Sequence, residues 1–322
     1  MNIRHGVQFK YKNQRHSLTR ALAYHYLMAD GTPFQSQEGW QTMQYNQEFK
    51  NRDPRMAQTI AAPDYVAVGT DASTKYYPSC KDYDRSGYRP IKYFSDDTHD
   101  GAGTSTTDYA IFRYGEVLLN YAEAKAELGE ADQTVIDQTV NVIRARVGMP
   151  ALDVVKANGA PDAFLSSYYT DKHLDGPDKG LILEIRRERT VELVNEGFRL
   201  WDMLRWHEGQ QLCPASNTLG PGFIGCWFPG LGEYDMNNDG TPDLCIYTGT
   251  KPSTDCENTL DVSEGKENTL SEGTSGYLIQ FKDQTYKWEE KDYLYPIPVK
   301  QIQIYPKDEA TGESVLTQNP GY

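Results

Sequence analysis

A short acidic segment, YDMNNDGTPDL at residues 234–244, has the residue types and spacing of a calcium loop. Oxygen-bearing side chains alternate along it, and Gly240 supplies the bend. The predicted ligands are Asp235, Asn237, Asp239, Asp243 and the carbonyl of Thr241. Ca²⁺ takes about six to eight oxygen ligands, and alternate residues of a turn can surround one point. We therefore expect a structural calcium ion here, and a solvated acidic turn without metal is the alternative.

Aromatic residues are the second chemical signal, with 23 Tyr and 5 Trp in the chain. Their rings stack on the apolar faces of sugars, and polar neighbours then bind the hydroxyl groups. Aromatic residues in loops are the better candidates for such platforms. These candidates are Trp40, Tyr76, Tyr77 and Trp227. Aromatic residues on expected helix faces are predicted to lie in the core instead, namely Tyr114, Tyr121, Trp201 and Trp206.

Two motifs that suggest cofactor binding or catalysis lack the rest of their pattern. GPGFIG at residues 220–225 has the spacing of a dinucleotide loop, but it contains Pro221 and precedes CWFPG rather than a helix. His207 and Glu208 would begin a zinc-protease helix, but Gln211 stands where the second His is needed. A glycosidase needs only two facing carboxylates, so the sequence leaves that class open.

Five cysteines lack the spacing of a zinc site. Cys213 and Cys226 bracket one loop, and Cys245 and Cys256 bracket another, so two local disulfides are one interpretation. The other is that these residues and Cys80 are unpaired, small hydrophobic side chains. Both interpretations stay open at the level of sequence.

Charge and hydropathy exclude several classes of protein. The formal net charge of the 322 residues is −14, which disfavours nucleic acid and other polyanionic partners. No apolar run is long enough to span a membrane, and the polar N-terminal sequence MNIRHGVQFKYKNQRHS does not resemble a signal peptide. The length is sufficient to bury a substantial core.

Helical periodicity dominates the middle of the chain. Apolar residues at three- and four-residue spacing predict an amphipathic helix over residues 112–130, capped by Gly129. A second helix is expected over residues 132–147, which would complete a hairpin of the tetratricopeptide type. Residues 180–206 predict more helix, interrupted at Gly197. Its dense charges, at residues 184–192, are expected to pair with one another on a surface that packs against its own domain.

These patterns divide the chain into three parts. Residues 1–105 are loop-rich, residues 106–208 form a helical platform, and residues 209–322 contain loops and short strands rich in Gly and Pro. Long loops on a rigid platform commonly carry ligand-binding residues. We therefore expect the ligand in the loops and not on the platform.

Three segments of the chain resemble the RagB/SusD family. They are FRYGEVLLNYAEAKAELGE at residues 112–130, YLYPIPVKQIQIYP at residues 293–306 and QNPGY at the C-terminus. The chain also matches a longer sequence pattern of this family, I-R-x-E-R-x-x-E-L-x-x-E-G-x-R-x-x-D-x-x-R-W. The matching residues are Ile185, Arg186, Glu188, Arg189, Glu192, Leu193, Glu196, Gly197, Arg199, Asp202, Arg205 and Trp206. The resemblance implies that these residues are architectural. It covers most of the chain and is weakest over residues 207–282.

The resemblance implies a mainly α, SusD-like fold with tetratricopeptide-type hairpins, long ligand-binding loops and a few short strands. It also implies a non-enzymatic receptor that binds oligosaccharides and delivers them to a SusC-like TonB-dependent transporter of the outer membrane. Capture of peptides or other nutrients is the alternative within the family. A secreted glycoside hydrolase and a protein-interaction scaffold are alternatives from other classes.

The order of the family words indicates which part of such a protein this chain represents. Members of the family resemble surface lipoproteins that begin at an acylated Cys. Here YLMADGTPF at residues 26–34 and NRDPRM at residues 51–56 already resemble the second half of the family. We therefore expect residues 1–322 to be a C-terminal region whose lipid anchor lies on a missing N-terminal half.

Overall fold

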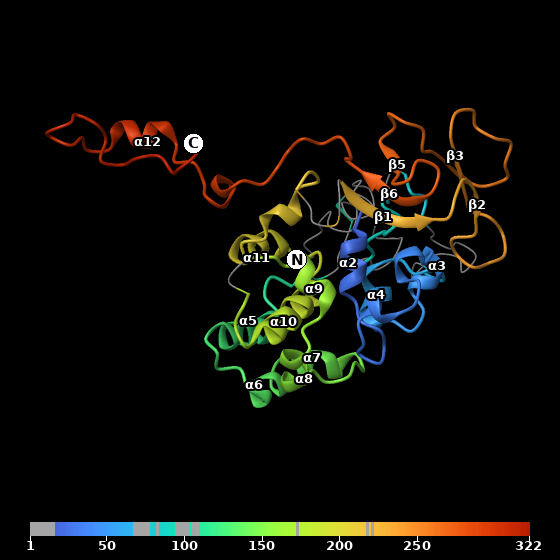
Figure 1. The fold of residues 1–322 in the computed structure, drawn as a ribbon, viewed down its shortest axis with the longest axis horizontal. Coiled ribbons are helices and arrows are strands. Elements are labelled where there is room, and N and C mark those ends of the chain that lie inside the picture. The colour runs from blue at the N-terminus through green and yellow to red at the C-terminus, as the bar shows by residue number, and fades with distance from the viewer. Residues whose placement is uncertain are drawn as a thin grey trace.

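The computed structural model of the protein describes residues 17–66, 78–81, 84–93, 103–104, 108, 110–171, 174–216, 219 and 222–322. Figure 1 shows a body made of helices on one side and short strands on the other, with a C-terminal arm that extends away from it. Helices outnumber strands among the described residues, as the sequence predicts. The fold is therefore mainly α with a few short strands.

The helical side of the body is organised around α10 (Lys179–Glu192), which packs most closely against α5 (Tyr114–Glu127) and α8 (Val154–Gly159) among the neighbouring helices. The other helices on this side are α6 (Gln133–Asp137), α7 (Val140–Arg146), α9 (Ala163–Tyr168) and α11 (Arg199–Arg205). Aspartate side chains cap several of these helices, because each accepts a hydrogen bond from a free N–H of the first turn. Asp132, Asp153 and Asp162 do so at the starts of α6, α8 and α9.

The predicted helices are confirmed, with two breaks. Gly129 follows α5 at φ 68°, the left-handed conformation expected of a C-terminal cap. The second predicted helix is split into α6 and α7, because the Thr139 hydroxyl donates back to the Val135 carbonyl at 2.6 Å and the Thr139 backbone leaves the helical region. Between α10 and α11 the chain turns at Asn195 and Gly197, both with positive φ.

The loop-rich first part contains short helices beside two small sheets. Its helical elements are α2 (Arg20–His25), η1 (Phe34–Ser36), η2 (Trp40–Thr42), α3 (Tyr45–Glu48) and α4 (Pro54–Thr59). Strand β6 (Gly276–Gln280) lies between β1 (Phe223–Phe228) and β5 (Asn268–Leu270), antiparallel to both. In the other sheet, β3 (Leu244–Tyr247) pairs antiparallel with β2 (Gly232–Tyr234) and parallel with β4 (Asn258–Asp261). Both η2 and α2 lie against β1.

Core placement confirms one aromatic prediction and corrects three. Trp206 is buried, but Tyr114 is 70% exposed, Tyr121 47% and Trp201 55%. Helix α5 turns a different stripe toward α10, which includes Leu118, Leu119, Ala122 and Ala126. The apolar residues of α5 therefore form two stripes, and spacing alone does not decide which stripe is buried.

Helix α10 buries most of its charges. Arg186, Arg187, Glu188, Arg189 and Glu192 are each at most 5% exposed. Glu188 is held between Arg55 of α4 and Arg144 of α7, at 2.9 and 2.6 Å. Buried charges persist only when paired and hydrogen-bonded. Most of these charges pair as expected, but in the interior and largely with other helices; Arg186 has only the distant Glu127.

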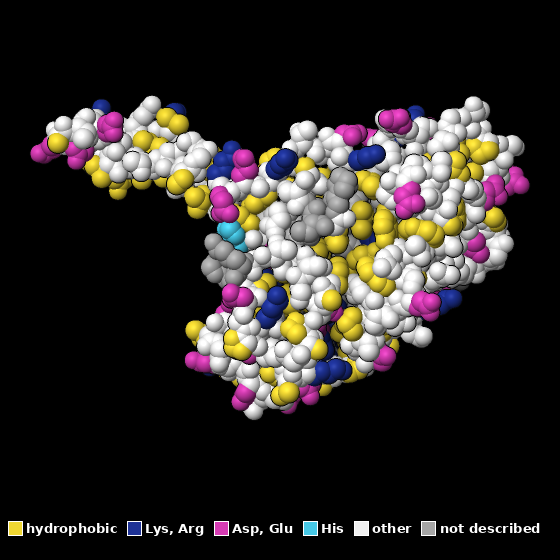
Figure 2. Space-filling view, viewed as in Figure 1, with side chains coloured by type: hydrophobic (Ala, Val, Ile, Leu, Met, Phe, Trp, Pro, Cys, Tyr) yellow, Lys and Arg dark blue, Asp and Glu magenta, His cyan; other side chains and the backbone are white. Residues whose placement is uncertain are grey.

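The C-terminal arm begins near η5 (Glu290–Tyr293) and carries α12 (Val299–Ile304). Figure 2 shows hydrophobic side chains along this arm, and the exposed ones include Tyr295, Val299 and Ile304. Among the described residues, no helix combines the length and apolar character needed to cross a bilayer.

All five cysteines carry free thiols. The local disulfides of the first interpretation are therefore not formed. Cys226 lies near Cys80 in the core and not in a loop with Cys213, since both thiols approach Gly87. Burial raises the pKa of Cys80 and of Cys226, which keeps both thiols protonated.

Candidate functional site

Four aromatic side chains from separate segments form one connected group, which we call the aromatic strip; three of them are partly exposed, and Tyr24 is buried between them. Its members are Trp40 of η2, Tyr24 of α2, and Tyr277 and Trp227 of the paired strands β6 and β1. The rings of Trp40 and Tyr24 meet edge to face with centroids 5.1 Å apart. The side chains of Tyr24 and Tyr277 share a hydrogen bond. Tyr277 lies directly opposite Trp227, and such cross-strand partners share one face of a sheet.

The buried Arg20 contacts three members of the aromatic strip, namely Tyr24, Tyr277 and Trp40. Its guanidinium carbon is 5.3 Å from the Tyr24 ring centroid and 5.0 Å from that of Tyr277, which is the range of cation–π contacts. It forms an ion pair with Glu48 at 2.6 Å and donates to the Trp40 carbonyl at 3.4 Å. Burial lowers the pKa of Arg20, but Glu48 and the hydroxyls of Tyr88, Tyr24 and Tyr277 together raise it by more, so the guanidinium stays charged. The strip is thus rigidly supported.

The strip unites two of the predicted platform residues. Trp40 and Trp227 are both half-buried and belong to it, whereas Tyr76 and Tyr77 lie outside the described residues. Sequence reasoning missed Tyr24 and Tyr277. Tyr277 stands between two buried residues of β6, but Ile279 on the same face of the strand is also buried, so strand periodicity does not assign Tyr277 to an outer face. The pairing of β1 with β6 spans about fifty residues and has no local signal.

A second group of aromatic residues surrounds an open pocket of about 300 Å³ at the base of the arm. We call it the arm pocket. His207 and Tyr293 stack with centroids 3.9 Å apart, and Trp288 meets Tyr293 edge to face. Gly209 is required there, because a Cβ would lie 2.0 Å from the Trp288 ring. The pair His207–Glu208, which resembled part of a zinc motif, thus supports an aromatic pocket.

The predicted calcium loop uses its oxygens internally. Asp235 accepts hydrogen bonds from the backbone N–H groups of Asp239 and Gly240, and Asp239 accepts from that of Thr241. Asp243 accepts from Met236. Across the described ranges, no three His, Cys, Asp or Glu side chains gather closely enough to hold a metal. The loop therefore has the predicted bend but not a completed ligand cage.

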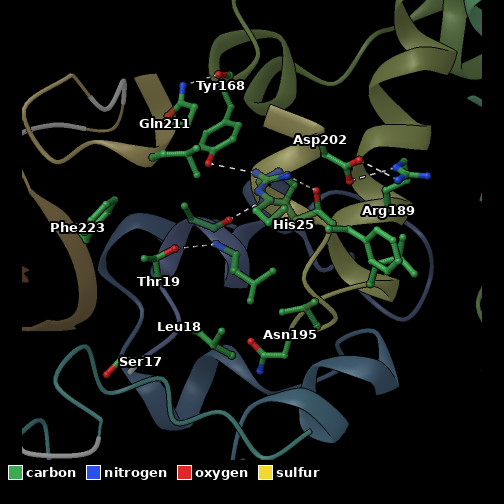
Figure 3. A pocket seen from close by; sticks show the side chains of 18 residues that line it. Ser17, Leu18, Thr19, His25, Tyr168, Arg189, Asn195, Asp202, Gln211 and Phe223 are labelled. Atoms are coloured by element: carbon green, nitrogen blue, oxygen red, sulfur yellow. Dashed lines mark hydrogen bonds and ion pairs between the residues drawn. The ribbon is translucent and has the colours of Figure 1, made fainter. Parts of the chain in front are cut away.

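A third feature is a more enclosed pocket of about 280 Å³ where the start of α2, the end of α10 and α11 meet (Figure 3). We call it the α10–α11 pocket. His25 lies in its middle, with Nδ1 2.7 Å from the Ala21 carbonyl and Nε2 3.1 Å from the Tyr169 hydroxyl. In Figure 3 the Tyr168 hydroxyl points into the same pocket, where it accepts a hydrogen bond from Arg199 at 3.4 Å. Burial, with a contribution from the cation of Arg199, lowers the pKa of His25 well below its usual value.

We expect stability to fall below about pH 6.5 because of His25. The unfolded chain binds a proton on this side chain near its ordinary pKa of about 6.5, whereas the folded chain does not. The free energy of unfolding should therefore drop by up to about 1.4 kcal/mol per pH unit as the pH falls below that value. Urea unfolding at several pH values measures how the free energy of unfolding depends on pH. For His25→Gln this dependence should be shallower by the same amount. Equal slopes would contradict the assignment.

Comparison with known proteins identifies the family. The model of the SusD family matches residues 7–322. SusD-like protein P38 of Formosa agariphila is 30% identical over 114 residues, which are 35% of this chain and 20% of that protein. A SusD-like carbohydrate binding protein of Bacteroides fragilis is 23% identical with a TM-score of 0.55, over 90% of this chain and 50% of that one.

Another SusD-like protein of Bacteroides fragilis is 22% identical with a TM-score of 0.53, over 95% of this chain and 47% of that one. The chain thus spans about half the length of these solved structures and a smaller part of the Formosa protein. The structural likeness shows a SusD-like fold, as the sequence motifs indicate. Because the family match also extends over nearly all 322 residues, the chain belongs to the SusD family.

Proposed function

We propose that this chain binds oligosaccharides without converting them, and that the aromatic strip holds the sugar rings. Membership of the SusD family supports the first part, together with the carbohydrate binding named for one solved relative. One observation carries the second part, which is that the partly exposed rings of Trp40, Tyr277 and Trp227 are connected through the buried Tyr24. Rings fixed before the ligand arrives lose little entropy on binding.

The chemistry of the strip suits a glycan. Indole and phenol rings offer flat apolar faces to the C–H face of a sugar. Next to Trp40, the side chains of Gln41 and Thr42 are exposed and can exchange hydrogen bonds with sugar hydroxyls. Such retention requires no pair of acid and base groups. A hydrolase, in contrast, requires two carboxylates placed across the scissile bond.

Trp227→Ala is expected to weaken oligosaccharide binding at least tenfold, because it removes one stacking face. Binding to a panel of immobilised oligosaccharides, followed by calorimetry on those retained, measures the loss. Trp201→Ala is the matched control, since Trp201 is exposed on α11 and outside the strip. Reducing ends should not accumulate in the same samples. Unchanged binding by Trp227→Ala would mean that the aromatic strip is not the glycan-binding site. A loss of binding seen only in Trp288→Ala would mean that the glycan binds in the arm pocket.

The role of the whole protein follows from the same proposal. We infer that it is a cell-surface lipoprotein of the outer membrane that passes its ligand to a SusC-like TonB-dependent transporter. Tetratricopeptide-like stacking of the helices would supply the platform. Peptide or other nutrient capture is the alternative ligand class, and retention of peptides but of no glycan on the same panel would favour it.

We also propose a structural Ca²⁺ at the loop of Asp235, Asn237, Asp239, Thr241 and Asp243. Burial raises the pKa of Asp243, and the neighbouring carboxylates Asp239 and Asp235 raise it further. A divalent cation would relieve this repulsion if the loop closed around it. Millimolar Ca²⁺ should therefore raise the melting temperature above that in chelator, and Asp239→Asn should reduce the increase. Identical melting temperatures would refute the site.

A further inference from the structure

The α10–α11 pocket contains a positive charge with no counter-ion among the described residues. Arg199 donates to the hydroxyls of Thr190, Tyr169 and Tyr168 at 2.8, 3.3 and 3.4 Å. Within the described part of the chain, no carboxylate forms an ion pair with it. Burial lowers the pKa of Arg199, but the two tyrosine hydroxyls raise it by more, so it remains a cation. The three hydroxyls accept three hydrogen bonds from a group with five N–H donors, and they do not neutralise its charge.

The other charged groups around the pocket are already balanced. Asp202 is bound to Arg189 at 2.8 Å and to Arg205 at 2.7 Å, and Arg189 also contacts Glu123 at 3.2 Å. Arg187 beyond His25 is paired with Asp162 and Glu184. His25 is neutral at physiological pH because its pKa is lowered. Among the described residues, the net charge that faces the cavity is therefore that of Arg199.

Arg186 adds to this positive potential from behind the pocket wall. Its guanidinium carbon is 5.5 Å from the Tyr169 ring centroid and 4.8 Å from that of Trp206. The carboxylate of the exposed Glu127 stays 4.0 Å from this guanidinium. In the described part of the chain, Arg199 thus lies near Tyr169 and Trp206 without a carboxylate partner, and Arg186 has only the distant Glu127. An anion in the pocket would offset this positive charge.

The walls of the pocket determine what else the ligand must carry. Leu18, Leu22, Leu193, Phe198, Leu212 and Phe223 line it, so most of the exposed lining is apolar. A volume of about 280 Å³ is slightly below the usual range of ligand pockets, which is about 300 to 1,000 Å³, so the ligand must be small. A branched aliphatic or aromatic group with one anionic end fits this combination better than a sugar ring does.

We propose that the α10–α11 pocket binds the carboxylate of a small apolar acid, with Arg199 as the binding group and the leucine and phenylalanine side chains around the apolar body. The carboxylate accepts hydrogen bonds from the Arg199 guanidinium, in the manner of Arg–carboxylate pairs elsewhere. Both the C-terminal residue of a peptide and a free aliphatic acid present this chemistry. The site is separate from the aromatic strip and does not depend on glycan binding.

Matched acids and amides test the proposal by calorimetry on the full chain. 4-Methylpentanoate represents a free acid, and acetyl-Gly-Leu represents a peptide C-terminus. We expect at least one of these acids to bind at least tenfold more tightly than its own amide. Binding of the acetyl-Gly-Leu pair alone assigns the source to peptides, and binding of the 4-methylpentanoate pair alone assigns it to free acids. Equal affinity of each acid and its amide, or binding of neither acid, would overturn the proposal.

Variants then locate the charge. Arg199→Gln should remove the preference for acid over amide, and Arg199→Lys should retain part of it. Arg146→Gln is the control, because Arg146 is an exposed arginine outside this pocket. If circular dichroism shows that Arg199→Gln does not fold, the proposal is tested by two other measurements. These are the ratio of acid to amide affinity in the wild-type protein and the same ratio in Arg199→Lys. A full preference in a folded Arg199→Gln variant would show that another group binds the acid.

Discussion

Replacement of Glu188 by Gln is expected to lower the free energy of unfolding by about 3–5 kcal/mol. Glu188 is almost fully buried between Arg55 and Arg144, so its loss leaves two buried guanidinium groups short of a counter-charge. Although burial raises the pKa of Glu188, the two arginines lower it to about 2, so the carboxylate is charged throughout the neutral range. Urea unfolding followed by circular dichroism measures the change.

An exposed ion pair provides the control. Glu130 contacts Lys125 at 2.6 Å, but both side chains are largely hydrated. Glu130→Gln should therefore change the free energy of unfolding by less than about 1 kcal/mol. Similar losses in the two variants would mean that burial does not determine the strength of these pairs. Retention of wild-type stability by Glu188→Gln would mean that the neighbouring carboxylates of Arg55 compensate for the missing charge.

The charges of α10 illustrate what local sequence reasoning can predict. Their dense alternation indicates mutual pairing, and pairing is what the structure contains. It does not indicate that Arg55, more than 130 positions away in the chain, and Arg144 supply the partners of Glu188. Long-range partners determine whether a charged helix face is solvated or buried. A single helix carries no information about them.

Helix α5 gives the same lesson for apolar residues. Its existence and its glycine cap could be predicted from periodicity, whereas its buried face could not. Tyr114, Val117 and Tyr121 have helical spacing, as does the stripe with Leu118 and Ala122 that packs in the core. Propensity and spacing predict a helix, and only the position of neighbours such as α10 selects between its faces.

The candidate site is partly predictable for a related reason. Trp40 and Trp227 are candidates from sequence because they have polar, Gly and Pro neighbours, and the structure brings their segments together through β1. The connecting rings, Tyr24 and Tyr277, come from a helix and a strand and have no such local signal. Arg199 is one of several arginines in the family pattern. The sequence does not show which of them have carboxylate partners, so the lack of one for Arg199 among the described residues could not be predicted.

Gly180→Ala is expected to destabilise the fold by about 3 kcal/mol. A Cβ at this position of α10 would lie 1.9 Å from the Ala157 carbonyl oxygen and 2.5 Å from its carbon. The two helices cannot easily separate, because the Asn158 side chain accepts a hydrogen bond from the Leu181 N–H at 2.8 Å and donates one to Asp178 at 2.9 Å. The methyl group therefore forces α8 and α10 apart and breaks the cap of α10.

Gly159→Ala is the matched control, two residues after Ala157 at the end of α8. A Cβ added at Gly159 would meet no atom within 4 Å among the described residues, and the φ of Gly159 is not positive. The usual preference of a helix for Ala over Gly should then apply, with a gain of up to about 1 kcal/mol. The same substitution is thus expected to lower the free energy of unfolding at Gly180 and to raise it at Gly159, although both sites lie where α8 meets α10. Thermal and urea unfolding of both variants measure this difference, and a neutral Gly180→Ala would mean that the close approach of α8 to α10 is not required for stability.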